Sequence, residues 1–214
     1  VANRIGVFSI LAVMHHTAAF GLGFDTVDAL TGPKIGRPRS ATFRTGDVVG
    51  LDTLAHVVNT MRDTLPSDPW HAFFKAPAWL DGLIARGALG QKTKAGIYRK
   101  QGKAIEVFDP AAGDYRASDD SLSADVAAIL KLADPAARLK ALRESGDAQA
   151  QFVWAIFRDL FHYCAVHLAD IAHCARDVDF AIRWGFGWKL GPFELWQAAG
   201  WQQVAGWIAE DIAA

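Results

Sequence analysis

A pattern of residues that occurs twice is the feature that most constrains the fold. The first copy contains, in order, Thr26-Val27-Asp28, Gly32, Gly36, Pro38, Phe43, Asp47 and Gly50, and the second contains Asp177-Val178-Asp179, Gly185, Gly187, Gly191-Pro192-Phe193, Gln197 and Gly200. Each copy, called a cassette below, follows a long apolar segment, and in each a Phe stands seven residues before a Gly. A repeat of this length predicts two similar helical units that were fused and pack on each other.

Apolar residues at helical spacing surround both cassettes. They predict long helices over residues 2–20 and 148–175, of which the first ends at Gly21 and Gly23. Thr26 is the expected N-cap of a short helix over 27–31, and Thr45 or Asp47 that of a helix through Leu65. Further helices are expected at 70–86, 123–132, 135–144 and 197–213.

One segment between the cassettes has a different period. Ile97 to Lys100 and Ile105 to Phe108 alternate around Gln101-Gly102-Lys103, which predicts a small β-hairpin. The polar stretch Pro110–Asp120 is expected to be a linker. The predicted fold is therefore mainly α, with residues 1–95 as the first helical repeat unit, 96–120 as β-hairpin and linker, and 121–214 as the second helical repeat unit.

Bulk composition excludes some partners. The chain has 214 residues, is 51% hydrophobic and carries a net charge of -1, which disfavours nucleic acid or an anionic membrane as the main partner. Residues 5–24 carry no formal charge and have the length of a membrane span. His15 and His16 interrupt them and Asp25 follows them, so we expect a buried core helix and no membrane span.

The cysteines bear on the compartment. Cys164 and Cys174 lie ten residues apart in one predicted helix, too far for a mutual disulfide. Free buried thiols fit a reducing compartment, and the chain shows no signal peptide, so the expected location is cytoplasmic. Since the chain begins with Val in the middle of an expected helix start, we expect a piece of a longer protein.

The sequence lacks the common cofactor motifs. Gly87-Ala88-Leu89-Gly90 and Gly185-Phe186-Gly187 follow no predicted strand, and a dinucleotide fingerprint needs a strand, a tight turn and a helix in succession. They are better interpreted as turns that let helices pack closely. His162 and His167 are five residues apart, which is not the i, i+4 arrangement with a nearby carboxylate that would build a zinc site, and no metal is expected.

Two features stay open on the residues alone. The basic loop formed by Lys34, Arg37, Arg39 and Arg44 could contact a phosphate, or could be solvated and paired with Asp25, Asp28 or Asp47. Asn3, at the head of the first helix, is in isolation an expected N-cap.

The cassettes also carry a family resemblance. Asn3-Arg4-Ile5, followed by Val27-Asp28 and its Gly/Pro loop, resembles the C-terminal domain of 3-hydroxyacyl-CoA dehydrogenases. The second cassette is similar to the second copy in multifunctional β-oxidation proteins, and Gly90 to Tyr98 is similar to the family's segment before the hairpin. Ile105 to Asp114 resembles the variant fused to an enoyl-CoA hydratase.

The resemblance implies helical units of the 6-phosphogluconate dehydrogenase C-terminal-like type. It implies NAD-dependent oxidation of (3S)-3-hydroxyacyl-CoA, with NAD and a His–Glu base pair on a Rossmann domain absent from this chain, so that no cofactor is expected here. Asn3 matches the family's active-site Asn, beside the acyl thioester, and is the catalytic and substrate-binding candidate. Trp184 matches an aromatic near the substrate. Gln197 departs from the Asp usual in the family, which Asp47 supplies in the first copy.

The resemblance implies acyl-CoA, the chain's own Rossmann domain and a fused hydratase as partners. The alternative is a non-catalytic helical protein-interaction module. On that view the eight Trp and the basic loop serve a protein partner.

Overall fold

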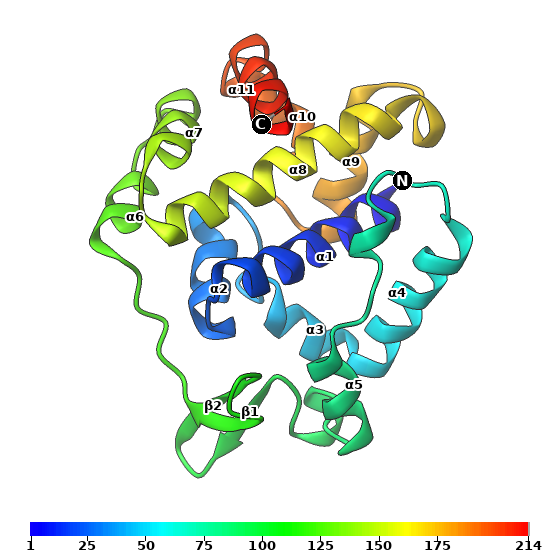
Figure 1. The fold of residues 1–214 in the computed structure, drawn as a ribbon, viewed down its shortest axis with the longest axis vertical. Helices are drawn as coiled ribbons and strands as arrows, with labels where there is room; N and C mark the ends of the chain where they lie inside the picture. Colours follow the sequence, from blue (N-terminus) through cyan, green and yellow to red (C-terminus); the bar gives the residue numbers. More distant parts are fainter. Residues whose placement is uncertain (214) are drawn as a thin grey trace.

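Two long helices cross the centre of the molecule and carry its core. In the computed structural model, which describes residues 1–213, α1 (Ala2–Phe20) and α8 (Ala148–Ile171) lie side by side (Figure 1). The ring of Phe8 stacks on that of Tyr163 with centroids 3.7 Å apart, and His16 Nε2 lies 2.6 Å from an Asp159 carboxylate oxygen. Both helices are apolar on most sides because each is covered on most sides.

The two cassettes build matching sets of helices. α1 is followed by α2 (Phe24–Thr31), α3 (Phe43–Val49) and α4 (Leu51–Thr64), and α8 by α9 (Ala175–Phe186), α10 (Pro192–Ala198) and α11 (Trp201–Ala213). In both sets a long helix leads to a shorter second helix, then to a two-turn helix of seven residues, and then to a final one. The mainly helical fold with a small antiparallel sheet is confirmed, and the repeat is visible in the order of its helices.

Gly50 and Gly200 explain the seven-residue spacing from Phe to Gly. Their φ angles are 100° and 84°, a backbone region that other residues adopt only with strain, and each separates the two-turn helix from the last helix of its set. The single helix predicted from residue 45 to 65 is therefore wrong, because Gly50 breaks it into α3 and α4. The long helix predicted through residue 175 likewise ends at Ile171.

The predicted helix caps were also wrong. α2 begins at Phe24 with Gly23 at its cap, three residues before the cap position expected at Thr26. α3 begins at Phe43, and its first amides are capped by Asp28 of α2 instead of by Thr45 or Asp47. The local sequence suggested nearby hydroxyl and acidic side chains as acceptors for the first amides of the helix. In the structure the acceptor for α3 is a buried carboxylate that tertiary packing brings to these amides.

A three-stranded sheet lies between the two sets of helices along the chain. β1 (Tyr98–Gln101), β2 (Ala104–Asp109) and β3 (Asp114–Ala117) pair antiparallel in that order, with Tyr98 opposite Val107 and Phe108 opposite Tyr115. The hairpin is confirmed, whereas β3 occupies part of the stretch predicted to be a linker. Between the two sets lie the helical segments η2 (His71–Phe73), α5 (Ala78–Ala85), η3 (Gln91–Thr93), α6 (Ala124–Ile129) and α7 (Pro135–Glu144). A further short one, η1 (Pro33–Ile35), lies inside the first set, between α2 and α3.

The loops of the two cassettes meet each other. The Lys189 backbone N–H donates to the Gly36 carbonyl oxygen at 2.8 Å. Gly36 and Gly187 both have positive φ, 79° and 66°, and each faces the other cassette: a Cβ on Gly36 would lie 3.5 Å from Lys189, and one on Gly187 3.3 Å from Pro38. The two loops therefore contact each other from both sides.

Two further expectations concern burial. Cys164 is buried in α8, but Cys174 is exposed at the cap of α9, so only one of the two thiols is buried as expected. Within residues 1–213, none of the helices combines the length and the apolar character needed to cross a bilayer.

Candidate functional site

Asn3 is the second residue of α1 and is exposed to solvent. Val1, and not Asn3, occupies the cap of this helix, and no side chain caps it. The simple capping role that residue type alone suggested is therefore wrong. The amide of Asn3 is available at the surface, at the end of a helix that otherwise runs through the core.

Arg4 anchors the helix start beneath Asn3. Its guanidinium donates from Nη2 to Asp68 and from Nε to the Tyr163 hydroxyl, each at 3.0 Å, and that hydroxyl donates to Asp68 at 3.0 Å. The Asp68 side chain is 1% exposed, and burial raises the pKa of Tyr163. This mutually hydrogen-bonded group, in which Asp68 and Tyr163 are buried and Arg4 is partly buried, fixes the first turn of α1, so Asn3 stands on a rigid support.

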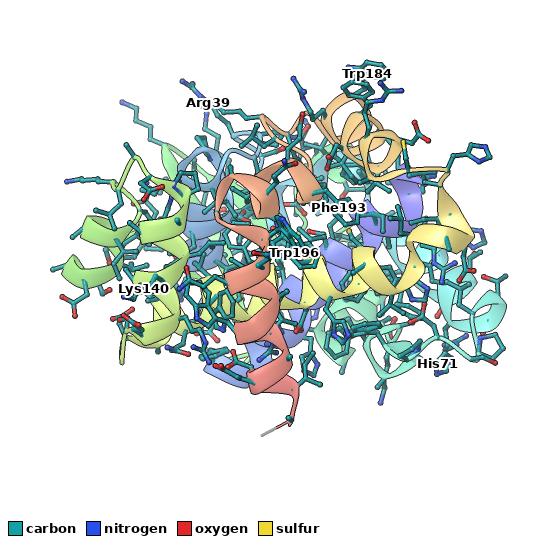
Figure 2. All side chains as sticks on the ribbon, turned by 90° about the horizontal axis from the view of Figure 1, so that it is seen from above. Arg39, His71, Lys140, Trp184, Phe193 and Trp196 are labelled. Atoms are coloured by element: carbon teal, nitrogen blue, oxygen red, sulfur yellow. The ribbon has the colours of Figure 1, made fainter. Side chains whose placement is uncertain are left out.

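Trp184 lies in the last turn of α9 and is 79% exposed. Figure 2 shows it projecting from the outer side of this helix, away from the body of the molecule. Its ring stacks on that of Phe180 one turn earlier, with centroids 5.0 Å apart and 9° between the planes. Large aromatic side chains are costly to leave in water, so an exposed Trp supported by a second ring is a candidate contact surface.

The structure brings the two candidate residues to neighbouring turns. Gly185 lies against the first turn of α1, where a Cβ on it would be 3.1 Å from Ala2, and the Phe186 ring occupies the space that a side chain on Gly6 would need. Asn3 and Trp184 each stand one residue from this contact. The edge formed by the first turn of α1 and the last turn of α9 is called the α1/α9 edge below.

The side chains at this edge set limits on its chemistry. A primary amide donates and accepts hydrogen bonds, and an indole offers a flat apolar face and one N–H donor. Neither group titrates near neutral pH, so neither acts as a general acid or base. The α1/α9 edge can orient a ligand and polarise one of its oxygens, but a proton must be moved by other groups.

The basic loop divides into residues with different roles. Arg44 lies 4.0 Å over the Tyr98 ring and approaches Asp28 at 4.0 Å, which matches part of the pairing alternative. Asp25 instead pairs with Arg116 of β3: burial would raise its pKa, but hydrogen bonds from Arg116 outweigh burial and lower it. Arg37, in contrast to the exposed Lys34 and Arg39, is buried.

The cassette acids have structural roles that the sequence reasoning missed. Asp28 accepts hydrogen bonds from the backbone N–H groups of Thr42, Phe43 and Arg44, and Asp179 accepts one from that of Phe193. The signal was present as an Asp 14 or 15 residues before the Phe in both copies. We interpret Val27-Asp28 and Val178-Asp179 as framework residues that hold the two-turn helices.

Nothing in residues 1–213 fits a dinucleotide. The described strands form one antiparallel sheet, whereas a dinucleotide fold places the pyrophosphate between a parallel strand and the helix that follows it.

Comparison with known proteins gives a consistent result. Residues 1–100 match the model of the family described as 3-hydroxyacyl-CoA dehydrogenase, C-terminal domain. The chain is 38% identical over 221 aligned residues to a probable 3-hydroxyacyl-CoA dehydrogenase of Bacillus subtilis, with 98% of the chain covered. It is 26% identical to a putative fatty acid oxidation complex trifunctional enzyme of Rickettsia prowazekii, with 95% covered.

The relatives are longer than this chain. The alignments cover 28% of the length of each of these two proteins. Among solved structures, 3-hydroxybutyryl-CoA dehydrogenase from Escherichia coli matches with a TM-score of 0.55 at 14% identity, over 94% of this chain and 53% of that one. At this identity the match speaks for the fold. The resemblance inferred from Asn3-Arg4-Ile5 and the cassettes is confirmed, and the chain belongs to the 3-hydroxyacyl-CoA dehydrogenase family, as a helical C-terminal region whose residues 1–100 match the family's C-terminal domain.

Proposed function

We propose that this chain is the substrate-side helical part of an NAD-dependent 3-hydroxyacyl-CoA dehydrogenase of fatty-acid β-oxidation. In this proposal it completes the acyl-CoA pocket, while NAD and the base that takes the hydroxyl proton belong to a Rossmann domain elsewhere in the enzyme. The observation that carries the proposal is the exposed Asn3 on a start of α1 that the ion pair of partly buried Arg4 with buried Asp68 holds in place.

Asn3 has a definite task in this proposal. Oxidation of a 3-hydroxyl group and polarisation of the neighbouring thioester both change the charge on an oxygen. An amide N–H that is already oriented toward that oxygen stabilises the change without reorganisation. Trp184 lies on the adjacent turn of α9, and its exposed ring offers an apolar wall for the acyl chain.

The proposal includes partners that follow from the relatives. One of them is named a fatty acid oxidation complex trifunctional enzyme, which supports a further fused activity such as an enoyl-CoA hydratase. A cytoplasmic location and the division into units at 1–95, 96–120 and 121–214 are also part of the proposal.

A turnover assay tests the proposal. The 214-residue chain and the longer protein that carries it are each supplied with NAD⁺ and (3S)-3-hydroxybutyryl-CoA, and NADH is followed by absorbance at matched concentrations. We expect NADH only with the longer protein. NADH formation by the chain alone above the no-protein rate would contradict the division of labour, and none from the longer protein would contradict the activity.

A non-catalytic interaction module is the second candidate. It is favoured by Trp184 and Trp201, which are 79% and 56% exposed, because large exposed aromatics are enriched at protein interfaces. If the longer protein shows no dehydrogenase activity and the 214-residue chain binds a protein partner through Trp184, this second function replaces the first.

A further inference from the structure

A cavity of about 490 Å³ lies where the two cassette loops meet. The loop around η1 forms one side, the loop between α9 and α10 forms another, and both lie over α8. The hydrogen bond from Lys189 N–H to the Gly36 carbonyl joins the two loops at its rim. A volume of this size falls within the range of small-molecule sites.

Arg37 lines this cavity with an incomplete set of hydrogen bonds. The residue is 7% exposed, and within residues 1–213 its Nε and Nη2 atoms are buried without an acceptor. Its guanidinium stacks over the Trp188 ring at 4.1 Å, which fixes the plane of the group. Burial lowers the pKa of Arg37 to about 9.

An unpaired buried guanidinium is costly to the fold. Donors that leave water without gaining an acceptor lose their hydration with nothing to replace it, and the cost is larger when they carry charge. Such groups are rare in native proteins and call for an explanation, such as an acceptor supplied by water, an ion or a ligand. The planar fork of an Arg matches the paired oxygens of a phosphate or carboxylate.

The other charged residues that line the cavity are also positive. Lys34, Arg138 and Lys189 also line the cavity, and no Asp or Glu is among the described residues that do. The remaining wall is apolar, with Phe157 and Leu160 from α8 and Leu195 from α10. The positive charge of four cationic side chains is more than a single carboxylate would neutralise. An inorganic ion would leave the apolar wall without a contact.

We propose that this cavity binds a phosphorylated organic ligand, whose phosphate accepts from Arg37 and whose carbon part packs on the α8 wall. Lys34, Arg138 and Lys189 supply the remaining positive charge at the cavity. This answers the question left open for the basic loop, in favour of phosphate contact for Arg37 and Lys34. The proposal does not rest on the proposed dehydrogenase function, since it uses neither Asn3 nor Trp184.

The first test compares small probes on the unmodified 214-residue chain. Binding of phenyl phosphate, inorganic phosphate, benzoate and phenol is measured by calorimetry at constant ionic strength in a phosphate-free buffer. We expect phenyl phosphate to bind at least about tenfold more tightly than the other three. Equal affinity for phenol or benzoate would overturn the phosphate assignment, and equal affinity for inorganic phosphate would overturn the role of the apolar wall.

The second test uses matched variants in the same basic loop. Arg37→Met keeps the apolar stem and removes the fork, while Arg39→Met removes an exposed charge that Figure 2 shows pointing into solvent. We expect Arg37→Met to weaken phenyl phosphate binding at least about tenfold and Arg39→Met to change it less than about twofold. Equal weakening by both variants would reduce the effect to general surface charge and overturn the site.

A thermal melt without ligand separates loss of binding from loss of folding. Removing an unpaired buried charge should leave the Tm of Arg37→Met equal to or above that of the unmodified chain. If this variant instead fails to fold, Arg138→Met, on the α7 side of the cavity, replaces it and should also weaken phenyl phosphate binding. Unchanged binding in the variant that folds overturns the proposal.

Discussion

Both cassettes use a buried Asp to cap a helix, but the Asp of the first cassette accepts more hydrogen bonds than that of the second. In each, a buried Asp from the second helix of the set caps the seven-residue helix that begins near the Phe shared by the two copies. Asp28 accepts from Phe43 N–H at 2.7 Å, and Asp179 from Phe193 N–H at 2.8 Å. Asp28 also accepts from two neighbouring amides and from the Tyr98 hydroxyl. The first cassette thus ties its helices to the sheet, and the second does not.

The contrast between Asp47 and Gln197 follows from the same difference. The Asp47 carboxylate accepts from the amides of Ile97 and Tyr98, at 2.7 and 2.8 Å, and so fixes the start of β1. Gln197, at the corresponding position of α10, is exposed, and no strand follows the second cassette within residues 1–213. An acid therefore stands at position 47, where backbone N–H groups need an acceptor, and Gln stands at position 197, which is exposed.

The largest expected effect is on Asp28. Asp28→Ala should lower the free energy of unfolding by roughly 3–5 kcal/mol, because several buried donors lose their acceptor, whereas Asp179→Ala should cost roughly 1–2 kcal/mol. Urea denaturation measures both, with Asp120→Ala, an exposed acid in an irregular segment, as the control. Equal losses for Asp28 and Asp179 would show that the bonds to the sheet add nothing.

A smaller effect is expected at the second pair of positions. Asp47→Ala should cost roughly 2–3 kcal/mol and loosen the sheet, because the amides of Ile97 and Tyr98 are left unpaired, and Gln197→Ala should change stability by less than about 0.5 kcal/mol. Urea denaturation measures the loss of stability, and hydrogen exchange at the Ile97 and Tyr98 amides measures the loosening of the sheet. If these amides stay protected in Asp47→Ala, the carboxylate is not what holds β1.

Some of the fold was predictable because it depends on local pattern. α1 spans the predicted residues, since its apolar run ends at two glycines, and the hairpin follows from alternation around Gln101-Gly102-Lys103. The break at Gly50 was missed because a single Gly inside an apolar period does not reveal its φ angle. The cap by Asp28 was missed because its partner, Phe43, lies 15 residues away.

The candidate site was predictable only through resemblance. Asn3 looks like a helix cap until the structure shows Val1 in that position, and Trp184 is one of eight Trp with no local mark of exposure. The burial of Arg37 had no signal in the sequence either, because the neighbouring Lys34 and Arg39 are exposed and of the same charge. Burial of a polar group depends on which distant segments cover it.

The central claim is that the first turn of α1 contributes directly to catalysis. In the longer enzyme proposed above, Asn3→Ala should lower kcat/KM for a (3S)-3-hydroxyacyl-CoA on the order of 10- to 1,000-fold, because one polarising donor is lost. Its thermal stability should be unchanged, and Asn59→Ala on α4, the matched control, should keep its activity. An unchanged kcat/KM in Asn3→Ala would contradict the account and leave this chain a structural support alone.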